Sequence, residues 1–131
     1  MRSTCLTLAL VAASTLCVAQ PDITCKPDGN TREMDRCAEI ALKEKDRELN
    51  EAYQALLKSL GPESKDNRGD QAKVTKKLRE AQRAWVAFRD NDCEAKTTLW
   101  AEFTMRGAVY FGCMIERTDQ RIKELRSWVV R

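Results

Sequence analysis

The chain has 131 residues and a nearly balanced charge, with 23 Lys and Arg against 20 Asp and Glu, and it contains no histidine. The balanced charge disfavours nucleic-acid binding, which depends on a concentrated excess of basic residues. The absence of histidine removes the commonest general acid or base and leaves serine and cysteine nucleophiles without an activating partner. We therefore expect neither an enzyme nor a bound cofactor.

Residues 1–19 have the layout of a secretory signal peptide. Arg2 supplies a basic start, an uncharged apolar stretch follows, and small residues precede a predicted cleavage site before Gln20. The apolar stretch of about 15 residues is shorter than the roughly 20 that a membrane-spanning helix needs, so no membrane span is expected. Leu16 stands where a lipidation site has a small residue, which makes Cys17 a poor lipid-attachment site. The sequence predicts a periplasmic or secreted protein with a mature domain at residues 20–131.

Four of the six cysteines lie in the predicted mature domain: Cys25, Cys37, Cys93 and Cys113. An even number of cysteines in a short exported chain indicates two disulfides. Their spacings of 12, 56 and 20 residues do not match the close ligand pairs of a zinc site, so no metal is expected. Four cysteines permit three pairings, and the spacing does not choose among them.

Apolar residues repeat at helical intervals in three segments, which predicts an all-α protein. The first helix is expected to begin at an Asn30 cap that Glu33 completes, and to end at Gly61-Pro62. The second helix follows a polar linker and ends somewhere between residues 95 and 103. The third helical pattern resumes from about residue 110, and strand patterning is absent.

The short linker predicts that the first two helices are antiparallel neighbours. At about 28 residues each, they would span roughly 40 Å. In a three-helix bundle of this kind, the four cysteines return to one pole.

Polar residues lie beside the predicted packed faces of all three helices. Asp46 and Asn50 share one side of the first helix, Arg89 lies on the second and Arg121 on the third. A carboxylate beside the core with an arginine from another helix is most simply a structural ion pair that sets how the helices align. We expect a structural role for these four residues.

Aromatic and basic residues allow three further expectations. Four aromatic residues at helical spacing are expected in the core: Tyr53, Trp85, Phe88 and Trp128. Trp100 and Phe103 fall where the helical pattern weakens, and we expect them to form an exposed patch. The basic run at residues 73–83 is interpreted as a solvated helix face, because Asp70 and Glu80 accompany it.

Several motifs follow one another along the mature chain. They are Cys25; Met34-Asp35-Arg36-Cys37; Asp46-x-x-Leu49-Asn50-x-x-Tyr53; Leu78-Arg79-x-Ala81-Gln82-Arg83-Ala84-Trp85-Val86-x-Phe88-Arg89-Asp90-x-x-Cys93; and Cys113-x-x-x-x-Thr118-x-x-Arg121-x-x-x-Leu125. In this order they resemble the family of the lysozyme inhibitor LprI N-terminal domain. The resemblance implies a small, secreted or periplasmic, helical and disulfide-bonded bacterial domain. It also favours the pairs Cys25 with Cys37 and Cys93 with Cys113.

One segment departs from the family pattern. Between Cys93 and Cys113, members often have a turn of the Gly-Gly-Ser type, whereas this chain reads Met105-Arg106-Gly107-Ala108. The use of that loop in relatives therefore does not carry over to this chain.

The resemblance implies a protein that binds and blocks a lysozyme in the bacterial envelope. Such a blocker needs a group that enters a cleft lined by two catalytic carboxylates. Arg106 and Tyr110 are candidates, because disulfides near them would lower the cost of ordering a binding loop. Asp92, Glu94 and Glu102 flank the same pole and would suit a basic partner.

Two alternatives remain open at the level of the sequence. The binding group could instead lie on the interhelical linker, where Lys65 and Arg68 are candidates. The protein could also be an envelope or stress-related interaction protein with a different partner and no lysozyme inhibition, since a fold does not define a function. A test of lysozyme binding distinguishes these functions.

Overall fold

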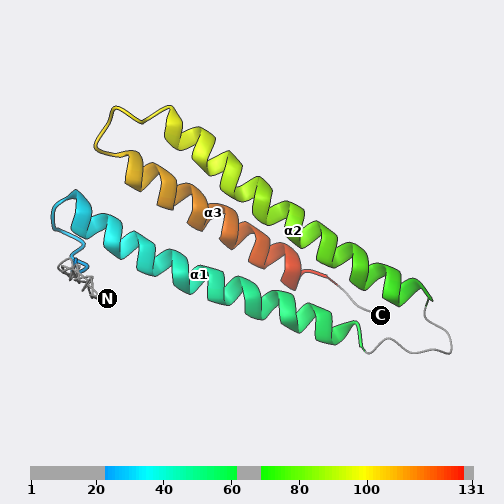
Figure 1. Ribbon diagram of the computed structural model, residues 1–131. Coiled ribbons are helices and arrows are strands. Elements are labelled where there is room, and N and C mark those ends of the chain that lie inside the picture. The colour runs from blue at the N-terminus through cyan, green and yellow to red at the C-terminus, as the bar shows by residue number, and fades with distance from the viewer. Residues whose placement is uncertain (1–22, 62–68, 129–131) are drawn as a thin grey trace, which may run out of the picture.

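The computed structural model describes residues 23–61 and 69–128, which contain three helices. These are α1 (Thr31–Ser59), α2 (Gly69–Thr98) and α3 (Arg106–Arg126). They form an elongated bundle in which α2 runs antiparallel to both α1 and α3 (Figure 1). The prediction of an all-α, three-helix protein is confirmed. The predicted signal peptide and the linker residues Lys65 and Arg68 lie outside the described residues.

The ends of α1 follow from local chemistry. The Asn30 side chain accepts hydrogen bonds from the amides of Arg32 and Glu33 at 3.0 and 3.2 Å. The Glu33 carboxylate in turn accepts from the Asn30 amide at 3.0 Å, which completes the predicted capping box. At the other end Gly61 has φ +75°, a left-handed conformation that glycine adopts without strain.

The central helix of the bundle is α3, which differs from the prediction that α1 and α2 are direct neighbours. Along most of the bundle α3 lies between them (Figure 1) and packs against both. Helices α1 and α2 approach each other where α3 ends, around Leu60 and Leu78. Helices α1 and α2 do run in opposite directions, as predicted (Figure 1), but the third helix takes the position between them because it carries apolar residues that pack against both.

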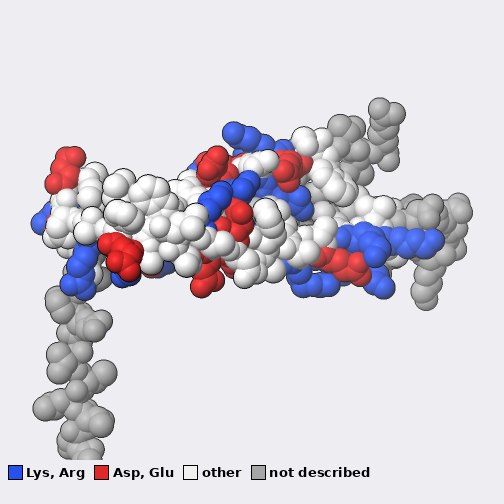
Figure 2. All heavy atoms as spheres, turned by 90° about the horizontal axis from the view of Figure 1, so that it is seen from above, with Lys and Arg blue, Asp and Glu red and all other residues white. Residues whose placement is uncertain are grey.

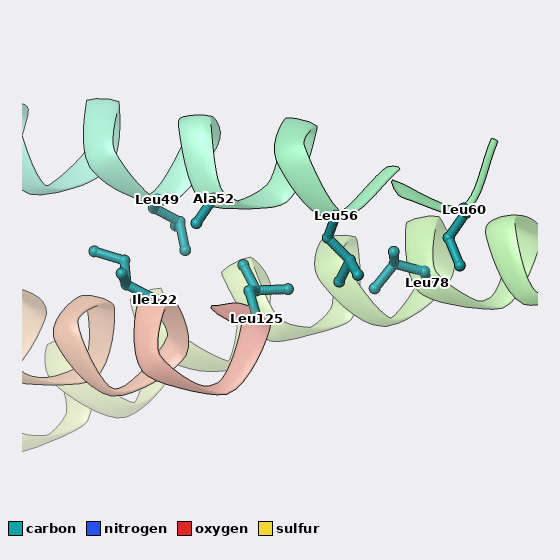
Figure 3. Close-up of a cluster of buried hydrophobic side chains, with 7 residues drawn as sticks. All are labelled: Leu49, Ala52, Leu56, Leu60, Leu78, Ile122 and Leu125. Carbon is teal, nitrogen blue, oxygen red and sulfur yellow. The ribbon is translucent and has the colours of Figure 1, made fainter. Parts of the chain in front are cut away.

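The buried apolar residues form two clusters along the bundle axis. The larger cluster contains Leu49, Ala52, Leu56, Leu60, Leu78, Ile122 and Leu125. Figure 3 shows that its α1 side chains point toward Ile122 and Leu125 of α3 and toward Leu78 of α2. The smaller cluster, near the start of α1, contains Leu42, Cys93, Cys113 and Met114.

Two disulfides lie toward the end of the bundle where α2 passes into α3. Cys25 is bonded to Cys37, which ties the segment before α1 to its second turn. Cys93 is bonded to Cys113 and joins the last part of α2 to the early part of α3. Both pairs are those that the family resemblance favoured.

The core-facing side of α2 is more polar than the sequence pattern suggested. Gln82 and Arg89 are buried, whereas Phe88 is 53% exposed. Trp128 is also exposed, so the prediction that these two aromatic residues belong to the core was wrong. The hydrophobic repeat misled because polar side chains can occupy core positions where they find hydrogen-bond partners, as Gln82 and Arg89 do here. Tyr53 and Trp85 do pack against the larger cluster.

Arg89 joins all three helices. Its guanidinium donates to the Asp46 carboxylate of α1 at 2.6 Å, to the Thr118 hydroxyl of α3 at 3.0 Å and to Asp90 at 3.0 Å. The Arg89 side chain is only 8% exposed, whereas the Asp46 side chain is 46% exposed. Burial opposes the charge on Arg89, but its hydrogen bonds to Asp46 and Asp90 outweigh that effect and raise its pKa.

Neighbouring side chains extend this network. The Thr118 hydroxyl is fully buried and donates to the carbonyl of Met114 at 2.7 Å. The ring of Trp85 is in contact with two guanidinium groups, whose central carbons lie 5.3 Å (Arg89) and 5.8 Å (Arg121) from the ring centroid. Arg121 also donates to the Gln82 side chain at 3.1 Å. Three of the four residues expected to be structural thus share one network, while Asn50 is exposed.

None of the three helices within the described residues combines the length and the apolar character that a membrane crossing requires.

Leu125 tests the packing of the larger cluster. Because its side chain is 2% exposed between the helices, we expect Leu125→Ala to lower the free energy of unfolding by about 2–5 kcal/mol. Urea unfolding followed by circular dichroism measures the change. Leu99→Ala is the matched control, because Leu99 is 80% exposed and should be replaced without a shift in midpoint. Equal changes in the free energy of unfolding for the two substitutions would contradict the buried position of Leu125 between the helices.

Arg89 tests the polar network. We expect Arg89→Ala to lower the free energy of unfolding by about 1.5–3 kcal/mol, the usual contribution of hydrogen bonds to a charged group. Arg89→Lys should not restore the loss, because an ammonium group cannot reproduce the planar fork of guanidinium donors. Arg47 provides the control, since its ion pairs with Glu44 and Glu51 are exposed. If Arg47→Ala lowers the free energy of unfolding as much as Arg89→Ala does, the contribution of Arg89 to stability does not depend on its burial.

Candidate functional site

The segment that connects α2 to α3 is short and internally hydrogen-bonded. The amides of Leu99, Trp100 and Ala101 donate to carbonyls three residues earlier, at 3.0–3.3 Å. The amides of Phe103 and Arg106 repeat the pattern at 2.9 and 3.3 Å. These successive turns, together with the nearby Cys93–Cys113 disulfide, restrict the shapes that the segment can adopt.

Large apolar side chains project from this segment. We define the pole surface as Leu99, Trp100, Glu102, Phe103, Met105 and Arg106. Its four apolar members are between 42% and 80% exposed. The rings of Trp100 and Phe103 meet edge to face with centroids 5.5 Å apart. The predicted patch at Trp100 and Phe103 is therefore confirmed and is wider than expected, because the chain that follows α2 turns Leu99 and Met105 outward as well.

A hollow of about 420 Å³ adjoins the pole surface, between the first turns of α1 and the start of α3. Its lining includes Arg32, Glu102, Phe103 and Arg106. The lining thus combines an aromatic ring with charges of both signs, which suits a partner that presents a polar group beside an apolar one.

The carboxylate of Asp35 in α1 lies against the start of α3, beside this hollow. A Cβ atom built on Gly107 would lie 2.3 Å from the Asp35 carboxylate, so the carboxylate can keep this position only beside a glycine. Helix α3 has no acidic residue in its own first turn and no side-chain cap. Asp35 therefore supplies the negative charge that favours a helix N-terminus.

The structure separates the five residues predicted to bind a partner into two groups. Arg106, Glu102 and Glu94 are exposed, and the first two belong to the pole surface. Tyr110 is half-buried and packs beside Phe111 against the smaller core cluster. Asp92 is half-buried as well. Tyr110 and Asp92 therefore fit a role in stabilising the fold better than a role in contacting a partner.

Asp92 is occupied by an ion pair. Its carboxylate accepts two hydrogen bonds from Arg117 of α3, at 2.9 and 3.1 Å, and lies 3.4 Å from Lys96. The hydrogen bonds from Arg117 hold the pKa of Asp92 below its usual value. Arg117 also lies over the exposed ring of Phe88, with 5.7 Å between the guanidinium carbon and the ring centroid.

One group of potential metal ligands exists within the described residues. A carboxylate oxygen of Asp92 and the sulfur atoms of Cys93 and Cys113 lie within 4.8 Å of one another. The two sulfur atoms are bonded to each other, so they offer no thiolate to a metal. The only potential ligand that remains in this group is the Asp92 carboxylate, which is already paired with Arg117.

Charge is distributed unevenly between the two ends of the molecule. Figure 2 shows mainly uncharged atoms toward the end that carries the α2–α3 connection, and a concentration of Lys and Arg toward the other end. The pole surface carries one arginine and one glutamate. Its recognition of a partner would therefore depend on apolar contact and local pairing rather than on net charge.

Acidification tests the Asp92–Arg117 pair. Because the pKa of Asp92 is lower in the folded state than in the unfolded chain, the pair stabilises the protein above about pH 4, and this contribution disappears as the pH falls through the folded pKa. The chain has no histidine, so the urea midpoint should stay constant from about pH 6 to 8. We expect Asp92→Asn to be less stable at neutral pH and to lose less on acidification than the unmodified protein. Glu94→Gln controls for the loss of one exposed carboxylate.

Comparison with known proteins assigns the family. The model of the family described as lysozyme inhibitor LprI matches residues 24–125, which include all three helices except the last residue of α3. An uncharacterised protein of Rhizobium meliloti (strain 1021) is 28% identical over 125 residues, which cover 93% of this chain and 90% of that protein. No solved structure matches the chain. The chain belongs to the lysozyme inhibitor LprI family.

Proposed function

We propose that this protein is exported to the periplasm or secreted, where it binds a lysozyme through the pole surface and inhibits it. Membership of the lysozyme inhibitor LprI family supports the partner. Two disulfides support an oxidising compartment, because such bonds persist outside the cytoplasm. The predicted signal peptide agrees with this location.

The observation that carries the proposal is the pre-organised state of the pole surface. Binding orders flexible loops at a cost in free energy, and a loop that is already ordered avoids most of that cost. Here the turns of the α2–α3 connection, the edge-to-face contact of Trp100 with Phe103 and the Cys93–Cys113 disulfide all restrict the loop before any partner arrives.

The composition of the pole surface suits a protein partner. Aromatic residues, methionine and arginine are enriched in protein interfaces, and Trp100, Phe103, Met105 and Arg106 are of these types. Few contiguous apolar side chains are exposed on proteins that act alone. The apolar centre would exclude water from a contact with the enzyme, and the charged residues would set its orientation.

Arg106 matches the chemistry of a lysozyme cleft. Lysozymes cleave their substrate between two carboxyl groups, at least one of which is ionised. In the proposed complex the exposed guanidinium of Arg106 approaches these carboxylates, while Glu102 faces basic residues at the rim. The formal charge of +2 on the chain from Gln20 onward gives no general attraction to a basic lysozyme, so the local contacts decide the affinity.

Phe103 provides the test. Clearance of a peptidoglycan suspension by animal-type and phage-type lysozymes is measured with and without the oxidised protein, and titration calorimetry follows binding in parallel. We expect inhibition by the unmodified protein and at least about tenfold weaker inhibition by Phe103→Ala, because truncation of an aromatic anchor commonly costs that much. Arg106→Ala should weaken inhibition as well.

Phe88→Ala is the matched control, because Phe88 is 53% exposed and Phe103 57%, on different parts of the surface. Its inhibition should equal that of the unmodified protein. Inhibition that is lost equally in both variants would remove the pole surface from the proposal. Failure of the unmodified protein to bind any of the lysozymes would remove inhibition itself and would favour an envelope interaction protein with another partner.

A further inference from the structure

A basic face covers the first half of α2, at the opposite end of the bundle from the pole surface. We define the basic face as Lys73, Lys76, Lys77, Arg79 and Arg83, all of which are exposed. Within residues 71–83 the only acidic residue is Glu80, so this stretch has a net charge of +4. The whole chain from Gln20 onward has only +2, because Arg2 is the one charged residue before it in a total of +3. The rest of that chain is therefore slightly negative.

Three of the five cations of the basic face are left without an ion pair in the described part of the chain. Lys77 pairs with Glu80 at 2.9 Å in an exposed position. Lys76, Arg79 and Arg83 have no ion-pair partner within the part of the chain that the structure describes. Like charges held close on one helix repel one another, and an anionic partner would relieve this repulsion.

An apolar groove adjoins the basic face. It has a volume of about 400 Å³ and is lined by Lys73, Val74, Lys77, Leu78, Ala81 and Trp128. Trp128 is 46% exposed and Val74 38% exposed, whereas Leu78 forms the buried floor. Two lysines thus flank an apolar floor that carries an exposed tryptophan at its edge. Lysine beside tryptophan is the pairing found where proteins meet the interface of a lipid bilayer.

We infer that this end of the molecule docks on a membrane surface rich in anionic phospholipids. The cations of the basic face would meet the phosphate groups, and Trp128 with Val74 would enter the boundary between headgroups and acyl chains. A second copy of this chain is disfavoured, because two basic faces repel each other. A soluble polyanion would account for the cations but would leave the apolar groove and Trp128 uncovered.

This docking is independent of the proposed inhibition, because it uses the opposite end of the bundle. Docked in this way, the elongated molecule would present the pole surface away from the membrane, because the start of α2 and the α2–α3 connection lie at opposite ends of the bundle (Figure 1).

Vesicle binding tests the inference. The oxidised chain from Gln20 onward, which contains all three helices, is sedimented with vesicles of phosphatidylcholine alone or mixed with phosphatidylglycerol. We expect binding only to the mixed vesicles and a loss of binding as salt is added. The double variant Lys76→Gln with Arg83→Gln should bind roughly thirtyfold more weakly, since each cation near such a surface contributes about fivefold.

Two further variants complete the design. Lys26→Gln with Lys43→Gln removes the same charge from exposed positions before α1 and near its middle, and should bind as the unmodified protein does. Tryptophan fluorescence should shift to shorter wavelength on binding, and Trp128→Phe should reduce that shift. Equal binding to uncharged vesicles, or equal weakening by the two double variants, would overturn the inference. Binding to soluble polyphosphate that is as tight as to vesicles, with no shift that depends on Trp128, would overturn it in favour of a soluble polyanion.

Discussion

The buried guanidinium of Arg89 is the constraint on which the rest of the bundle depends. A cation this poorly exposed is tolerated only if hydrogen-bond acceptors surround it, and here the acceptors come from α1, α2 and α3 together. The contact with Asp46 fixes how far α2 slides along α1, and the contact with Thr118 fixes α3 between them. The two apolar clusters lie on either side of this network, so each packs against helices that are already aligned.

The residues that identify the family are mostly those that hold the bundle together. Asp46, Arg89, Thr118 and Arg121 belong to the polar network, and the paired cysteines form the two disulfides. The pole surface lies between the family motifs and includes Met105 and Arg106, which belong to the segment where the chain departs from the family pattern. Family membership is therefore strong support for the fold, whereas binding specificity has to be read from a surface that the family motifs do not describe.

Sequence reasoning succeeded where short-range chemistry decides the structure. Asn30 with Glu33 and the glycine at residue 61 predicted both ends of α1, and the poor helical pattern near Trp100 predicted an exposed patch. It failed for Phe88, whose position in the apolar repeat suggested burial. The α2 face that turns inward carries Gln82 and Arg89. The sequence did predict an ion pair of Arg89 with another helix, but it did not show that these polar residues would take the core positions in place of Phe88.

The sequence by itself determined the three helices, the number of cysteines available for disulfides and the balance of charges, because these depend on neighbouring residues and on composition. Only the tertiary structure decided that α3 occupies the centre and that Asp92 forms an ion pair with α3. It also decided that Leu99 and Met105 are exposed beside Trp100 and Phe103. Each of these outcomes depends on which side chains meet from segments far apart in the chain. The local sequence pattern indicates on which face of its own helix a residue lies. Whether that residue is buried depends on the side chains that another helix brings against it.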